Sequence, residues 1–164
     1  MTVEYWMRQV YLKVTAMLVF LAPCVDAADP VWPKLTERLK GLFSTEMQQI
    51  SESMGTLTTA IATGDHESVK YIGISIRDSF VLKKSLTEQD KEDLMSALPP
   101  EFLELDQRFH QYADKLANAA ESKDSELQEF YLSRMVAACV NCHRQFAHDV
   151  FPGFDNDGED KHLH

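Results

Sequence analysis

Two cysteines and a histidine stand close together near the end of the chain, in the segment Cys139-Val140-Asn141-Cys142-His143. On a helix, Cys139, Cys142 and His143 occupy positions i, i+3 and i+4, so they project from one side. Two thiols can add across the two vinyl groups of a haem, and an adjacent imidazole can bind its iron. The C-x-x-C-H pattern is typical of this attachment. We therefore predict one covalent haem c, with thioethers from Cys139 and Cys142 and with His143 as the proximal iron ligand.

Other uses of a cysteine pair fit this sequence less well. A thioredoxin-type redox pair follows a strand, whereas the apolar pattern around Cys139 and Cys142 is helical. A zinc site needs further ligands, and His148 is the nearest spare histidine. A disulfide across so short a loop would constrain the unfolded chain very little. A redox pair or another metal site stays open as the alternative to haem.

Residues 1–27 have the pattern of a secretory signal peptide. Arg8 and Lys13 precede an apolar run at 14–22, and small residues follow up to Ala27. The run is too short to span a bilayer, which favours cleavage after Ala27 and export to the periplasm.

Export simplifies the cysteine count. Cys24 would leave with the signal, so Cys139 and Cys142 would be the two cysteines of the mature chain. The residues around Cys24 also approximate a lipoprotein cleavage box, although Pro23 fits that box poorly. Lipid anchoring through Cys24 is therefore the minor alternative to plain cleavage.

The composition limits the choice of partners. The chain has 164 residues and a formal net charge of −10, which is unchanged by removal of the signal. We expect one domain over 28–154 and a solvated acidic tail over 155–164. Strong acidity argues against nucleic acid and against anionic membrane surfaces as partners. It would suit transient docking on redox partner proteins that carry a basic patch.

Apolar residues recur at helical spacing in four stretches of the mature chain. These stripes run over Leu35–Ile61, Val69–Phe80, Phe102–Leu116 and Leu127–Phe146. Strand-like alternation is absent. The pattern predicts an all-α protein, an antiparallel four-helix bundle whose last helix carries the haem motif.

Turn and cap residues separate these stripes. Gly64-Asp65 should end the first helix, and His66 is expected to help cap the second. Thr87 with Asp90 resembles a capping box, and Pro100 suits the first turn of the next long helix. For the last helix we expect Asp124 or Ser125 as the cap, with Gln128 completing a box from Ser125.

A four-helix bundle with C-x-x-C-H near its end resembles the class II cytochromes c. That family comprises the high-spin cytochromes c prime and their low-spin, methionine-ligated relatives. The resemblance covers 35–146 and is most specific at 139–146, with further likeness at 47–50, 60–64 and 116–120. It implies a homodimer through the first two helices. Because the sequence shows no carboxylate pair, phosphate loop or nucleophile–base arrangement, we predict an electron carrier and not an enzyme.

The resemblance leaves the sixth iron ligand open. In low-spin relatives a methionine precedes the glycine that ends the first helix by a distance that Met47 matches closely. Met47 is therefore the candidate distal ligand, although its place on an apolar stripe equally suits an ordinary core residue. Met54 and His110 are weaker candidates. With an open sixth position, the protein would instead be a five-coordinate cytochrome c prime that binds small gases such as NO or CO.

The surroundings of the haem are also predicted from the resemblance. Many family members carry an arginine one turn before the sixth-ligand position, where this chain has Phe43, so the distal side should be apolar. Arg77, Arg108 and Arg144 are loose candidates for the propionate partners. The predicted haem contacts are Phe43, Ile50, Phe109, Tyr112, Arg144 and Phe146.

Overall fold

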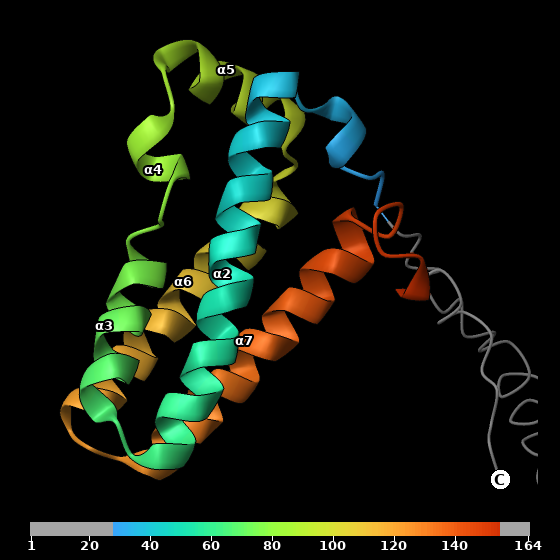
Figure 1. Cartoon of the computed structure of the whole chain (residues 1–164). Helices are drawn as coiled ribbons and strands as arrows, with labels where there is room; N and C mark the ends of the chain where they lie inside the picture. The colour runs from blue at the N-terminus through green and yellow to red at the C-terminus, as the bar shows by residue number, and fades with distance from the viewer. Residues whose placement is uncertain (1–27, 155–164) are drawn as a thin grey trace, which may run out of the picture.

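The computed structural model describes residues 28–154, and that part of the chain is all-helical with no strand (Figure 1). The α-helices are α2 (Glu37–Thr63), α3 (His66–Arg77), α4 (Leu82–Ser85), α5 (Glu88–Ala97), α6 (Pro100–Glu121) and α7 (Ser125–Phe146). Short 3-10 turns, η2 (Trp32–Lys34) and η3 (Pro152–Phe154), flank them. The all-α prediction is confirmed. The expected signal over 1–27, with Cys24, and the acidic tail over 155–164 lie outside the described residues.

Four of these helices form the body of a helical bundle. Helix α6 packs against α3 and α7, while α2 contacts both α3 and α7. In Figure 1, α3 and α7 lie on opposite sides of α2, with α6 behind it. Helices α4 and α5 make the connection from α3 to α6 at the end of the bundle where α2 begins.

Most helix ends follow the local signals in the sequence. The Thr36 hydroxyl accepts from the Leu39 N–H at 3.3 Å at the start of α2. Gly64 ends α2 with φ at 70°, a left-handed conformation that glycine adopts without steric cost. Thr87 and Asp90 form the predicted capping box of α5, whose two partners satisfy each other's backbone N–H groups.

The expectations at two other helix starts were partly wrong. Asp124, one of the two predicted caps, accepts from the Leu127 N–H at 2.9 Å, but no box forms from Ser125. The Gln128 side chain is fully buried and contacts His66 Nδ1, with Nε2 at 3.0 Å. His66 does not cap α3, because the Asp65 carboxylate does so. Both polar side chains join α3 to the start of α7.

The core has two parts along the bundle. One cluster holds buried apolar residues of α2, α3, α6 and α7, among them Leu57, Ile76, Leu116 and Met135. The other lies toward the C-terminal end of α7 and holds Val31, Leu35, Leu39, Leu98 and Phe146. The two cysteines of the motif pack against different clusters, Cys139 against the first and Cys142 against the second.

Helices α3 and α6 approach each other closely at Gly73. A Cβ atom there would lie 3.0 Å from the Ala113 carbonyl oxygen and 3.1 Å from the Ala117 Cβ. Glycine inside a helix is unfavourable by helix propensity, but here it permits the close packing. The structure shows that a side chain at Gly73 would push the two helices apart.

We expect Gly73→Ala to destabilise the protein by about 1–2 kcal/mol, because backbone atoms of α6 must move. Gly55→Ala is the matched control, since nothing lies within 4 Å of a Cβ there. The control should stabilise the protein by about 0.8 kcal/mol through helix propensity. Urea unfolding of the two variants measures both effects. If both substitutions stabilised the protein equally, helices α3 and α6 could not be packed as closely at Gly73 as described.

No helix in residues 28–154 combines the length and the apolarity needed to cross a membrane.

Candidate haem-attachment site

The C-x-x-C-H motif lies in the last two turns of α7, as the sequence predicted. Cys139, Cys142 and His143 are all half-buried, and the two cysteines lie on the side of α7 that meets the rest of the bundle. Both cysteines are free thiols in the structure. The motif therefore presents two unpaired sulfur atoms and an imidazole from one helical surface.

The two thiols are held in their neutral form. Burial raises the pKa of Cys139. Burial, followed by the Asp106 carboxylate and Cys139 itself, raises the pKa of Cys142 to about 12. A reactive redox cysteine needs a lowered thiol pKa, so the raised pKa values of these two thiols do not favour a thioredoxin-type site. Among residues 28–154 there is also no group of three or more His, Cys, Asp or Glu side chains placed to hold a metal ion, as a zinc site would need.

His143 is arranged as a neutral imidazole. Burial lowers its pKa, so the ring keeps a nitrogen lone pair that can bind iron. The ring stacks on Phe151, with the centroids 4.3 Å apart and the planes 19° from parallel. This stacking restricts the rotation of the imidazole.

Helix α2 presents an apolar strip toward the motif. Phe43 packs against the cluster that Cys142 contacts, and Ile50 belongs to the cluster that Cys139 contacts. Met47 lies between them on the same strip, four residues after Phe43 and three before Ile50. It therefore lies on the side of α2 that faces the cysteines of α7.

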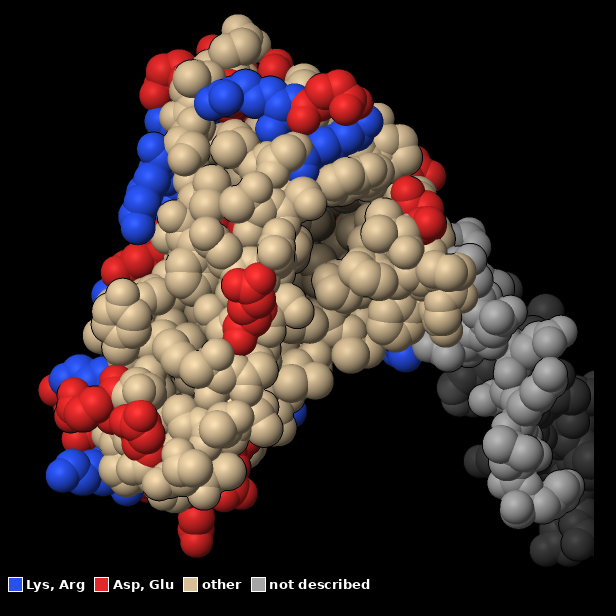
Figure 2. All heavy atoms as spheres, in the orientation of Figure 1, with Lys and Arg blue, Asp and Glu red and all other residues tan. Residues whose placement is uncertain are grey.

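Met47 is not a core residue, although the apolar stripe allowed that interpretation. Its relative exposure is 41 %, whereas Ile50 is 8 % exposed and Met54 packs against the first cluster. Helices α2 and α7 diverge toward the C-terminal end of α7 (Figure 1). Figure 2 shows the surface hollowed between the first half of α2 and that end of α7. An exposed thioether on the strip of α2 that faces the cysteines of α7 is suited to the distal side of a haem.

The other predicted aromatic haem contacts lie in the two core clusters. Phe109 is 9 % exposed in the first cluster, and Tyr112 packs against that cluster. Phe146 is buried in the second cluster, where its ring lies 5.4 Å from that of Phe102. The Phe43 ring contacts the other side of this group, 6.3 Å from Phe102. Contact between these residues and a haem stays a prediction.

The arginines proposed for the propionates differ in their surroundings. Arg77 is paired with Asp78 at 2.9 Å and with Asp114 at 3.2 Å, so its charge is already compensated between α3 and α6. Arg144 lies over the Phe154 ring at 5.8 Å, close to the end of α7 that carries the motif. Arg108 is exposed on α6. Of the three, Arg144 is placed nearest to the motif in the sequence and Arg77 is the least suitable.

His110, a weak candidate for the distal ligand, is held elsewhere. Its Nδ1 atom lies 2.7 Å from the Ile76 carbonyl oxygen, and its Nε2 atom lies 3.6 Å from Asp106 Oδ1. Both ring nitrogens are thus directed at oxygen atoms of α3 and α6.

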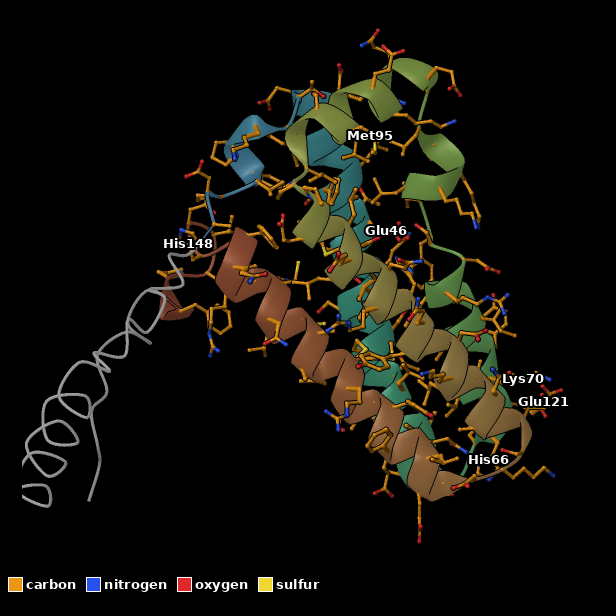
Figure 3. The ribbon with its side chains drawn as sticks, turned by 180° about the vertical axis from the view of Figure 1, so that it is seen from behind. Glu46, His66, Lys70, Met95, Glu121 and His148 are labelled. Carbon is orange, nitrogen blue, oxygen red and sulfur yellow. The ribbon has the colours of Figure 1, made fainter. Side chains whose placement is uncertain are left out.

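Glu46 is the polar residue that sequence reasoning missed. It is 2 % exposed and accepts hydrogen bonds from the Ser79 hydroxyl at 2.6 Å and from the N–H groups of Phe80, Val81 and Leu82 at 2.6–3.1 Å. Burial alone would raise its pKa, but the Ser79 hydroxyl and these N–H groups outweigh it and hold the pKa below the usual value. Figure 3 shows Glu46 inside the bundle, level with the connection from α3 to α4. A single glutamate on the apolar stripe between Leu39 and Ile50 was the signal that could have revealed it.

Comparison with known proteins adds no family assignment: no family model, no curated protein and no solved structure matches this chain. The chemistry of the site therefore has to be judged from its own residues. Two neutral thiols, a neutral imidazole and an exposed methionine on the facing strip of α2 fit a covalent haem as a donor set.

Proposed function

We propose that the chain is a periplasmic mono-haem c-type cytochrome that transfers electrons. Cys139 and Cys142 would hold the haem, and His143 would bind its iron on the proximal side. Met47 would bind on the distal side, which would leave no open position for an exogenous ligand. Thioether ligation raises the reduction potential, as suits outer-sphere electron transfer.

The exposure of Met47 is the observation that carries this proposal. Methionine is normally buried, whereas Met47 is 41 % exposed and lies on the strip of α2 that faces two half-buried cysteines. An apolar cofactor held between α2 and α7 would cover Met47 and the cysteine side of α7 together. The four-helix bundle with a haem on its last helix, as in class II cytochromes c, is part of the same proposal.

A five-coordinate, gas-binding cytochrome c prime is the second candidate. The apolar surroundings given by Phe43 and Ile50 favour it, since an uncharged distal side can accommodate CO or NO without a competing polar group. The two candidates differ in whether Met47 occupies the sixth position.

The absorption spectrum of the full chain, made in a bacterium that matures c-type cytochromes, tests the proposal. The expected product carries one covalent haem by mass spectrometry, shows sharp low-spin bands when reduced and does not react with CO. A high-spin spectrum that shifts on adding CO would support the gas-binding candidate instead. A product without covalent haem would contradict both.

We expect Met47→Ala to convert a low-spin spectrum into a high-spin one that binds CO, because the variant lacks the distal sulfur. Met95→Ala is the matched control, since Met95 is 63 % exposed on α5, away from the motif (Figure 3). Spectra of the ferric and ferrous proteins, with and without CO, are the measurement. An unchanged spectrum in Met47→Ala would remove Met47 from the ligand set.

The surface fits an acidic electron carrier. With a formal net charge of −10, the chain is suited to brief docking on a protein with a basic patch, where attraction speeds the encounter and salt weakens it. Acidic side chains are spread over several elements in Figure 2. The homodimer through α2 and α3 belongs to this proposal as an implication of the family resemblance.

A further inference from the structure

Asp106 and His110 of α6 form a polar pair one helical turn apart. Nδ1 of His110 donates to the Ile76 carbonyl oxygen at 2.7 Å, because a carbonyl can only accept. Nε2 of His110 faces Asp106 Oδ1 at 3.6 Å. A neutral ring with Nδ1–H therefore directs the Nε2 lone pair at a carboxylate, whereas a protonated ring directs an N–H at it. The geometry favours the protonated form.

The charges around His110 are mostly negative. Asp106 lies on its own helix and Glu46 acts from α2, while Arg77 of α3 is already paired with Asp78 and Asp114. Burial lowers the pKa of His110, but Asp106, the Ile76 carbonyl and Glu46 together outweigh burial and raise it above the usual value. His110 therefore holds a proton more tightly than an exposed histidine does.

The same carboxylate acts on the haem motif. Asp106 is among the groups that raise the pKa of Cys142, after burial of that thiol. Cys142 packs against the cluster to which Leu105, the neighbour of Asp106 on α6, belongs. Asp106 is thus within electrostatic reach of both the His110 ring and the sulfur that would carry the haem.

We propose that the Asp106–His110 pair is a redox-linked proton site, at which His110 Nε2 takes up a proton from solvent when the haem gains an electron. The inference rests on the proposed function. A one-electron donor protein supplies the electron, solvent supplies the proton, and both leave on oxidation. One N–H bond forms and no other bond changes. The coupling arises because the added electron contributes one more negative charge, beside those of Asp106 and Glu46. This charge stabilises the protonated, positively charged form of the His110 ring.

The size of the coupling follows from Coulomb's law. A unit charge about 12 Å away changes a proton affinity roughly tenfold at an effective dielectric constant of about 20, and salt reduces the effect. We therefore expect the proton affinity of His110 to be about three to ten times higher in the reduced protein than in the oxidised one. His110 should therefore lose its proton at a lower pH in the oxidised protein than in the reduced protein. Between these two pH values the midpoint potential should fall as the pH rises.

The holoprotein gives the first test. NMR titration of His110 in both oxidation states measures its proton affinity, and mediated potentiometry over the same pH range measures the slope of the potential. His110→Gln keeps a donor for Ile76 but cannot take up the proton, so it should remove the slope. His66→Gln should keep the slope, because His66 lies at the end of the bundle where α3 and α7 begin (Figure 3) and contacts Gln128 there. Equal proton affinities in the two states, or an unchanged slope in His110→Gln, would overturn the proposal.

A haem-free test separates this inference from the proposed function. In Cys139→Ala, Cys142 can be modified with either a cationic aminoethyl or a neutral methyl thiosulfonate. The cation at this sulfur should lower the proton affinity of His110 about threefold or more relative to the neutral group. Equal affinities would overturn the coupling even if wild type carries haem. A clear difference in a protein that never binds haem would support the coupling and contradict the proposed function.

Discussion

Replacing Cys139 and Cys142 together by alanine is expected to leave the chain without covalently bound haem. Both thiols lie on one side of α7, unpaired and half-buried, so each is available to one vinyl group. Haem held only through its iron is extracted by acid and organic solvent, whereas a thioether-linked haem stays with the protein. After extraction, mass spectrometry should find one haem on wild type and none on the double variant.

Two single substitutions in the motif, and a control substitution of a cysteine outside it, make this prediction more specific. Cys139→Ala and Cys142→Ala should each retain at most one thioether, with shifted absorption bands and a lower yield of holoprotein. Cys24→Ala removes a cysteine of the predicted signal segment and should leave haem content unchanged. Haem that survives extraction from the double variant, or haem lost from Cys24→Ala, would refute the assignment of Cys139 and Cys142.

The parts of the fold that local interactions decide were predictable. Gly64 terminates α2 because only a residue tolerant of positive φ suits that position, and Thr87 with Asp90 starts α5 by satisfying two backbone N–H groups. The motif could be placed on a late helix because Cys139, Cys142 and His143 share its helical periodicity. Each of these features is encoded within a few residues along the chain.

Features that depend on how helices meet were not predictable. Met47 and Ile50 belong to the same apolar pattern, yet Met47 is 41 % exposed and Ile50 is 8 % exposed. Gln128 has the right spacing for a capping box, but burial beside His66 gives its amide other partners. Phe80 continues the apolar stripe of α3, which ends earlier, at Arg77. Sequence periodicity shows which side chains share one face of a helix. It does not show which other helix, if any, that face contacts.

Glu46→Ala is expected to cause the largest loss of stability, about 3 kcal/mol, because it leaves several buried donors without an acceptor. The carboxylate accepts from the Ser79 hydroxyl and from three backbone N–H groups at the turn that leads into α4. Glu46→Gln keeps the shape but offers one acceptor oxygen in place of two, so it should cost about 2 kcal/mol. Glu37→Ala is the matched control, because that side chain is 90 % exposed and should change stability by less than about 0.5 kcal/mol.

The dependence on pH distinguishes lost hydrogen bonds from lost packing. Because the pKa of Glu46 is below its ordinary value of 4.5 in the folded chain, its contribution is complete above that pH. It is lost as the pH falls through the folded pKa. Urea unfolding of wild type and Glu46→Gln at a series of pH values should therefore show a difference that shrinks in acid. A difference independent of pH would mean that the charge of Glu46 does not contribute.

Glu46 also bears on the proposed haem ligand, because it is the neighbour of Met47 on α2. Successive residues of a helix are about 100° apart around its axis, since one turn takes 3.6 residues. When Glu46 is bonded to the turn before α4, Met47 is therefore turned toward the side that faces α7. Loss of this anchor in Glu46→Ala should give a mixture of low-spin and high-spin holoprotein, and Glu37→Ala should give none. A fully low-spin Glu46→Ala protein would show that core packing alone fixes the rotation of α2.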